Sequence, residues 1–173
     1  TILLCFPYVL FWHYSPMGWS EKEGYEAAVA AYYRAQFAKF GDLTADEATI
    51  AGLMANKDYM NSVAGTFVGK CASCHGQDGK GLVGPNLTDD AYINVKSLPD
   101  IYRIVNEGVT LKGMPAWGRQ LPNTELVLLS AYVASLRGTG GGGGKAPEGE
   151  IAAPWPEAEP LVFETESTEA GAE

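Results

Sequence analysis

The chain has 173 residues, of which 46% are hydrophobic, and this ordinary proportion excludes disorder over the whole length. The 21 Asp and Glu residues outnumber the 12 Lys and Arg residues, giving a formal net charge of -9. A surface this acidic repels phosphate groups, so we expect no nucleic-acid partner. Three cysteines are too few for a disulfide scaffold or a four-thiolate zinc site.

The opening segment is apolar and aromatic. Residues 1–14 contain no Asp, Glu, Lys or Arg, but they are fewer than the roughly 20 apolar residues that span a bilayer. A basic start and a small-residue cleavage site, which mark a signal peptide, are both missing. The aromatic residues resemble the interfacial belt at the end of a membrane helix. We therefore expect residues 1–19 to be the outer end of a transmembrane anchor, with an apolar arm packed on a partner or on the chain's own core as the alternative.

Helical signals begin directly after this segment. Ser20 with Glu23 forms a capping box ahead of apolar residues at helical spacing, and Thr44 with Glu47 forms a second capping box ahead of a short helix. The sequence therefore predicts a helical linker over residues 20–57.

Residues 58–138 carry three further helical segments separated by loops rich in Gly and Pro. The first is expected near 58–70, Ser97 caps the second, and Asn123 opens the third, which ends before Gly138. No stretch alternates strictly enough to predict a strand. The predicted fold class is all-α.

The chemistry is carried by Cys71, Cys74 and His75, which form the C-x-x-C-H attachment signature of c-type haem. One helical turn places both thiols within reach of the two vinyl groups of one porphyrin, and the adjacent imidazole becomes the proximal iron ligand. A thioredoxin-type dithiol would follow a strand in an α/β fold. A zinc site would need two more ligands, and only the distant Cys5 and His13 remain. The motif predicts one covalently attached haem c.

Met114 is the candidate for the second axial ligand, because it is the one methionine after the attachment signature. Gly113 and Pro115 flank it and constrain a loop that can hold a thioether against iron. A soft sulfur ligand favours Fe(II) and raises the reduction potential, whereas the alternative role of a methionine is to fill the core. We also expect the carbonyl of Pro85 to accept a hydrogen bond from His75, which fixes the imidazole tautomer.

The C-terminal segment, residues 139–173, contains a glycine run, eight Glu and one Lys. Such a composition buries too little apolar surface to offset its ordering entropy, so in isolation the segment is predicted to be disordered. We expect it to lie on another chain, with a solvated linker as the alternative. The side chains expected to anchor it are Trp155, Leu161, Val162 and Phe163.

Residues 58–136 resemble a class I cytochrome c domain and, more closely, the cytochrome c subunit III (CcoP/FixP type) of cbb3-type cytochrome c oxidases. The resemblance rests on the C-x-x-C-H run at 71–75, the Gly-Pro-Asn-Leu segment at 84–87 and the Gly-Met-Pro-Ala-Trp loop at 113–117. It implies an N-terminal membrane anchor and other subunits of a membrane complex as partners. The chain departs from the usual two-haem member, since it has a single attachment signature.

The function expected from these features is single-electron transfer within a respiratory complex, by a subunit that is not an enzyme by itself. Haem is attached through thioethers outside the cytoplasm, so the haem domain is expected on the periplasmic side. Donation to a photosynthetic reaction centre, membership of alternative complex III and a diffusible periplasmic carrier remain open alternatives. A haem peroxidase would need an open iron position and a distal acid–base group. An assembly role of the tail is a further alternative.

Overall fold

The computed structural model describes residues 40–163, together with 5–8, 11, 28, 35 and 37. The chain separates into two units, residues 1–38 and 39–173. The predicted anchor end and the first linker helix lie largely outside the described residues. In the part of the chain that is described, no helix is long and apolar enough to cross a membrane.

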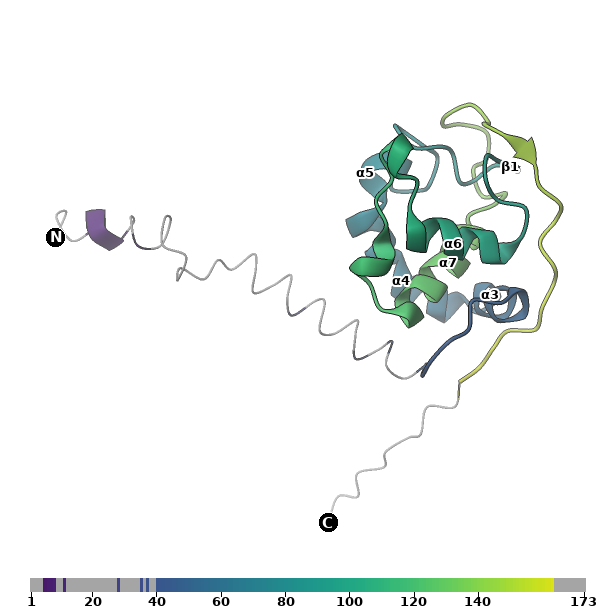
Figure 1. The fold of residues 1–173 in the computed structure, drawn as a ribbon, viewed down its shortest axis with the longest axis horizontal. Helices are drawn as coiled ribbons and strands as arrows, with labels where there is room; N and C mark the ends of the chain where they lie inside the picture. The colour runs from purple at the N-terminus through teal and green to yellow at the C-terminus, as the bar shows by residue number, and fades with distance from the viewer. Residues whose placement is uncertain are drawn as a thin grey trace, which may run out of the picture. The chain divides into compact units, whose positions relative to one another are not determined.

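The second unit is predominantly helical, as predicted, with α7 at its centre (Figure 1). Its elements are α3 (Glu47–Met54), α4 (Lys57–Lys70), α5 (Ala72–His75), α6 (Leu98–Glu107), the short 3-10 helices η1 (Thr110–Lys112) and η2 (Trp117–Arg119), and α7 (Asn123–Ser135). Helix α7 packs against α3, α4 and α6. The largest fully buried apolar side chains come from these four helices: Ile50, Leu53, Val63, Phe67, Leu98, Val127, Leu128 and Leu129. This shared core holds α4 in place, and α4 in turn carries the haem-attachment signature at its end.

Helix α3 begins two residues later than the sequence predicts. Asp46, not Thr44, is the N-cap, and its carboxylate accepts a hydrogen bond from the backbone N–H of Thr49 at 2.9 Å. The hydroxyl of Thr44 donates to the same carboxylate. A charged acceptor suits the positive end of the helix dipole better than a hydroxyl, which explains the correction.

The cap of α6 agrees with the prediction and gives the fold an acid-sensitive element. The carboxylate of Asp100 accepts hydrogen bonds from the Arg103 guanidinium at 2.9 Å and from the backbone N–H groups of Lys96 and Ser97 at 3.0 and 3.1 Å. These bonds, with Arg103 the largest contributor, lower the pKa of Asp100 from 3.8 to about 2. A carboxyl whose pKa is lower in the folded state stabilises the fold above its unfolded pKa, and this contribution is lost as pH falls through the folded value.

We therefore expect the free energy of unfolding to decrease as pH falls from the ordinary pKa of 3.8 to about 2. Urea denaturation at a series of pH values should show a shallower decrease in Asp100→Asn. The remaining decrease belongs in part to Asp46, whose pKa is also about 2. An unaltered pH dependence in Asp100→Asn would contradict this prediction.

A buried polar pair joins α4 to α7. The Thr66 hydroxyl donates to Oε1 of Glu125 at 2.9 Å, and both residues are buried. Thr66→Val keeps the shape of the side chain but leaves the carboxylate without this donor. We therefore expect the free energy of unfolding to fall by about 1–3 kcal/mol. Urea denaturation measures the loss. Thr110→Val, at an exposed position of η1, is the matched control and should change stability by less than about 0.5 kcal/mol; equal losses would contradict the prediction.

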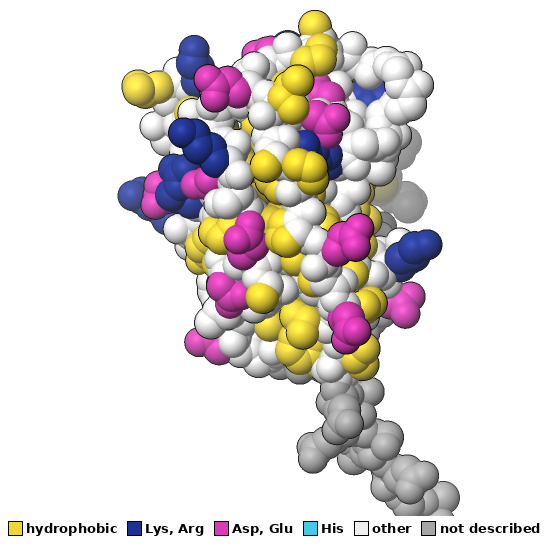
Figure 2. Space-filling view, turned by 90° about the vertical axis from the view of Figure 1, so that its right-hand side faces the viewer, with side chains coloured by type: hydrophobic (Ala, Val, Ile, Leu, Met, Phe, Trp, Pro, Cys, Tyr) yellow, Lys and Arg dark blue, Asp and Glu magenta, His cyan; other side chains and the backbone are white. Residues whose placement is uncertain are grey.

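The structure corrects the expectation that the chain contains no strand, and it places part of the C-terminal segment on its own unit. A two-stranded antiparallel sheet is present, in which β1 (Ala91–Tyr92) pairs with β2 (Glu150–Ile151). Up to residue 163, the segment is ordered on its own unit: it runs from the sheet along one side of the molecule to α3 (Figure 1). On this face, apolar side chains lie among Asp and Glu side chains, and Lys and Arg side chains gather mainly toward one edge (Figure 2).

Three of the four expected anchors are used, but they contact this chain itself. The Trp155 ring lies 5.4 Å from that of Tyr92, the backbone N–H of Leu161 donates to Gly52 at 3.0 Å, and Phe163 packs beside Tyr59. Val162 is exposed instead. The prediction of disorder treated the segment in isolation, whereas the folded unit supplies aromatic rings and backbone partners that offset the ordering entropy.

Candidate functional site

The two cysteines and the histidine of the signature lie on one helical turn. Cys71 ends α4 and starts α5, and its carbonyl accepts hydrogen bonds from the backbone N–H groups of Cys74 at 3.1 Å and His75 at 2.9 Å. Both cysteines are free thiols. Because α4 is anchored in the core through Phe67 and Val63, the turn that bears the thiols and the imidazole has a rigid base.

His75 is held in one tautomer. Its Nδ1 lies 3.0 Å from the carbonyl oxygen of Pro85, which is the acceptor expected from the sequence. A carbonyl only accepts hydrogen bonds, so Nδ1 carries the proton and the lone pair remains on Nε2. Burial lowers the pKa of His75, while the hydrogen bond to Pro85 acts in the opposite direction. A neutral imidazole with a free Nε2 is the form that coordinates a metal.

The loop that supplies Pro85 is closed onto the signature by backbone hydrogen bonds. The carbonyl of Cys74 accepts from the N–H groups of Leu82 and Gly84 at 3.1 and 2.9 Å, and that of His75 accepts from Gly81 at 2.7 Å. Gly84 lies directly against the imidazole: a Cβ at this position would be 2.8 Å from Cε1 of His75. Sequence reasoning missed this role, although the glycine's place directly before Pro85 is a usable signal.

The thiols do not have the character of a disulfide-exchange site. Burial raises the pKa of Cys71 to about 11, and the neighbouring Cys74 adds to the effect. A thiol–disulfide catalyst needs the opposite shift, because the thiolate is its nucleophile. Within residues 40–163 and the few described positions before them, no cluster of His, Cys, Asp and Glu is arranged to hold a metal ion by itself. The raised pKa of Cys71 favours haem attachment over a thiol–disulfide catalyst.

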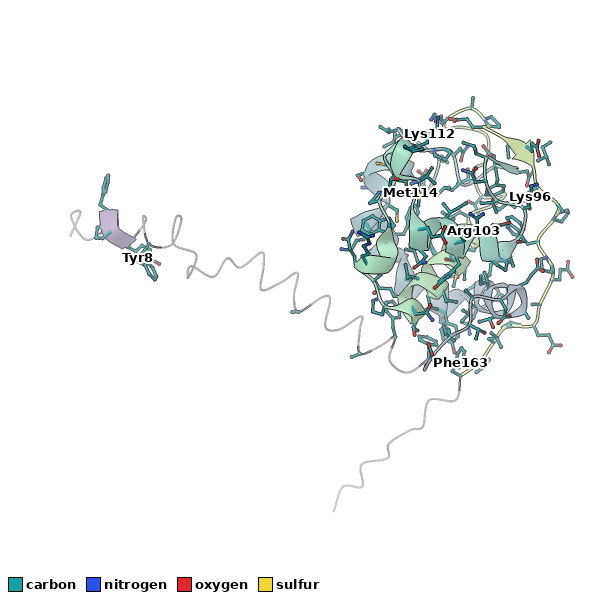
Figure 3. The ribbon with its side chains drawn as sticks, viewed as in Figure 1. Tyr8, Lys96, Arg103, Lys112, Met114 and Phe163 are labelled. Atoms are coloured by element: carbon teal, nitrogen blue, oxygen red, sulfur yellow. The ribbon has the colours of Figure 1, made fainter. Side chains whose placement is uncertain are left out.

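The Met114 loop lies on the same side of the unit as α5 (Figure 3). Met114 is half-buried, and its backbone pairs with Val109 through two hydrogen bonds of 3.0 and 3.2 Å. The Lys70 ammonium, next to Cys71, lies 5.9 Å from the ring centroid of Trp117, three residues after Met114. The tertiary structure thus brings the two segments together across more than thirty residues of sequence.

Exposed apolar side chains border both segments. They are Val68 at 48% exposure, Leu82 at 64%, Val83 at 79% and Leu111 at 99%. Val68 lies one turn before Cys71, Leu82 and Val83 belong to the loop that closes on α5, and Leu111 precedes Met114 in η1. Apolar side chains gathered around thiols, an imidazole and a thioether fit a flat apolar cofactor better than a bare metal ion. The residues present therefore fit haem c.

Comparison with known proteins gives a consistent result. The family model described as cytochrome c oxidase, cbb3-type, subunit III, matches residues 59–133. The cbb3-type cytochrome c oxidase subunit CcoP of Azospirillum sp. (strain B510) is 30% identical over 152 residues, which cover 78% of this chain and 50% of the relative. The subunit FixP of Azorhizobium caulinodans is 33% identical over 100 residues, covering 47% of this chain and 33% of the relative.

Two further likenesses are more local or more distant. The CcoP subunit of Rubrivivax gelatinosus is 42% identical over 72 residues, 40% of this chain and 23% of the relative. Cytochrome cL from Methylophaga aminisulfidivorans, a solved structure, is 19% identical with a TM-score of 0.44, covering 55% of this chain and 76% of that one. The chain spans half or less of the length of these curated relatives. Its residues 59–133 form a CcoP/FixP-like cytochrome c domain.

Proposed function

We propose that this chain is a membrane-anchored c-type cytochrome subunit that carries one haem and transfers single electrons within a cbb3-type cytochrome c oxidase. The observation that carries the proposal is the geometry of His75, whose Nδ1–H is bound to Pro85 and whose Nε2 is free, on the same turn as two free thiols. The family match over residues 59–133 supports it.

In this proposal each residue has a distinct task. Cys71 and Cys74 would hold the haem through thioethers, and His75 and Met114 would supply the two ligands to its iron. When bound, the haem supplies a centre that gains and loses one electron without bond rearrangement at the protein. Pro85 fixes the His75 tautomer, and the Met114 thioether favours the reduced state. With both axial positions filled, the chain transfers electrons and catalyses no reaction by itself.

The assignment to an oxidase complex rests on the relatives, which are named as cbb3-type oxidase subunits. In such a complex the electron would come from an upstream redox protein and pass to another subunit. The apolar segment 1–19 would anchor the chain, with the haem domain on the periplasmic side.

The test is purification of the full-length chain from native membranes in mild detergent, with mass spectrometry and reduced-minus-oxidised absorption spectra of the intact assembly. We expect one haem bound through two thioethers, a low-spin oxidised spectrum and a co-purifying haem–copper subunit with oxygen consumption. A complex with iron–sulfur subunits or photosynthetic pigments and no haem–copper centre would exclude the oxidase assignment. A high-spin oxidised spectrum would contradict ligation by His75 and Met114 and favour a peroxidase.

A further inference from the structure

Lys145 binds the loop 80–86, which contacts His75, through three separate groups. Its backbone N–H donates to the carbonyl of Lys80 at 2.8 Å, its carbonyl accepts from Nδ2 of Asn86 at 3.2 Å, and its ammonium donates to the carbonyl of Val83 at 3.1 Å. One residue of the C-terminal segment therefore contacts the start, the middle and the end of the loop 80–86.

That loop is the support of His75. Between the contacts made by Lys145 lie Gly84, which touches the imidazole, and Pro85, whose carbonyl accepts a hydrogen bond from Nδ1–H. Asn86 follows Pro85 directly and is itself buried. A displacement of Lys145 would therefore move Asn86 and, through it, the Pro85 carbonyl that accepts the hydrogen bond from His75.

The C-terminal segment is also held in place after Lys145, at residues 152–155. The Arg137 guanidinium donates to the carbonyls of Ala152 and Ala153 at 2.8 and 2.7 Å and lies 4.6 Å from the ring centroid of Trp155. Directly before Lys145, Gly144 has φ 96°, and a Cβ there would overlap the carbonyl oxygen of Lys80. The contacts of residues 144–155 thus depend on a close approach at one end and a cation–aromatic contact at the other.

We propose that residues 144–155 form a strap in which Lys145 is a positioning residue: it holds the loop 80–86 against His75 and thereby stabilises the Nδ1–Pro85 hydrogen bond of the axial ligand. The inference rests on the proposed ligation of haem iron by His75. It gives the C-terminal segment an intramolecular role in tuning the iron.

The strap also brings a charge pair to this loop. The Lys145 ammonium lies 2.6 Å from the carboxylate of Glu148, and the lysine side chain is 35% exposed. A positive charge near the iron favours Fe(II), and a negative charge favours Fe(III). Removing the two members of the pair one at a time should therefore move the reduction potential in opposite directions.

The first experiment compares Gly144→Ala with Gly142→Ala in the full-length haem protein. Both glycines have positive φ, but a Cβ at Gly142 would meet nothing within 4 Å, so backbone strain is matched. Nuclear magnetic resonance of the reduced protein follows hydrogen exchange of the His75 Nδ1 proton. We expect exchange to be on the order of tenfold faster in Gly144→Ala than in Gly142→Ala, as for loss of a hydrogen bond worth about 1.4 kcal/mol. Equal exchange rates would overturn the proposal.

The second experiment measures midpoint potentials of Lys145→Gln and Glu148→Gln, with Lys57→Gln as control. Lys57 is exposed at the opposite end of α4 from Cys71. Lys145→Gln keeps both backbone contacts, so the change of charge governs its potential, and Fe(II) should be disfavoured roughly threefold. Glu148→Gln should favour Fe(II), and Lys57→Gln should leave the potential unchanged.

The possible failures are distinguishable. If all three variants share one potential, the Lys145–Glu148 charge pair does not act on the iron and this part of the proposal is overturned, while the proposed electron-transfer function stands. If the unsubstituted chain lacks a His75-ligated haem, both fall together.

Discussion

Replacing Met114 by leucine is expected to convert the oxidised iron from low spin to high spin and to open the reduced iron to carbon monoxide. Leucine keeps the bulk of the side chain but has no sulfur donor, so one axial position loses its ligand. The reduction potential should also fall, because the thioether favours Fe(II). Absorption spectra with and without carbon monoxide, together with redox titration, measure all three changes.

Met54→Leu is the matched control for this prediction. Met54 is half-buried at the end of α3, and a volume-conserving exchange there should cost less than about 1.5 kcal/mol and leave the spectrum unchanged. If Met114→Leu also retains a low-spin spectrum and excludes carbon monoxide, Met114 is not the ligand. In that case its role would be core filling, the alternative weighed from the sequence.

Gly84→Ala should reduce the yield of correctly ligated haem protein and destabilise what forms. The new Cβ would lie 2.8 Å from Cε1 and 2.9 Å from Nδ1 of His75, closer than non-bonded carbon and nitrogen atoms approach. Either the imidazole tilts or the loop moves away, and both weaken the Nδ1–Pro85 hydrogen bond. Overpacking of this kind costs about 1–3 kcal/mol. Thermal unfolding and the low-spin absorption of the purified chain measure the two effects.

Gly69→Ala provides the comparison. Gly69 lies in α4, it is exposed, and a Cβ there would meet nothing within 4 Å. Alanine has the higher helix propensity, so this variant should be more stable by about 0.5–1 kcal/mol with unchanged spectra. A Gly84→Ala protein with wild-type stability and spectrum would show that the glycine does not pack against the ligand.

The helices and the site residues follow from local sequence because their causes are local. The capping box of Ser97 and Asp100, the helical spacing before Cys71 and the C-x-x-C-H signature each extend over a few residues. The structure agrees with these expectations for α4, α6 and α7 and places Pro85 beside His75. The exception is α3, where two possible caps lie two residues apart and the carboxylate of Asp46 is the one used.

Composition predicts disorder of the C-terminal segment in isolation, and the structure shows which contacts order it up to residue 163 on the folded unit. Eight Glu in residues 139–173 favour disorder only when no folded surface offers contacts to the segment. The lone lysine among them, Lys145, was a usable signal, because a single cation in an acidic segment invites a specific partner. Its partners are the carbonyls of the loop 80–86 and the neighbouring Glu148.

The sequence by itself determined the helical class, the thiols and imidazole that fit haem c, and Met114 as the candidate for the second ligand, because these depend on residue type and short-range spacing. Only the tertiary structure decided that Gly84 packs on the imidazole, that the Met114 loop meets the end of α4, and that Lys145 binds the loop 80–86 that contacts His75. The physical reason is that these contacts join residues far apart in the chain, and their geometry exists only after the core around α7 has set the positions of the helices.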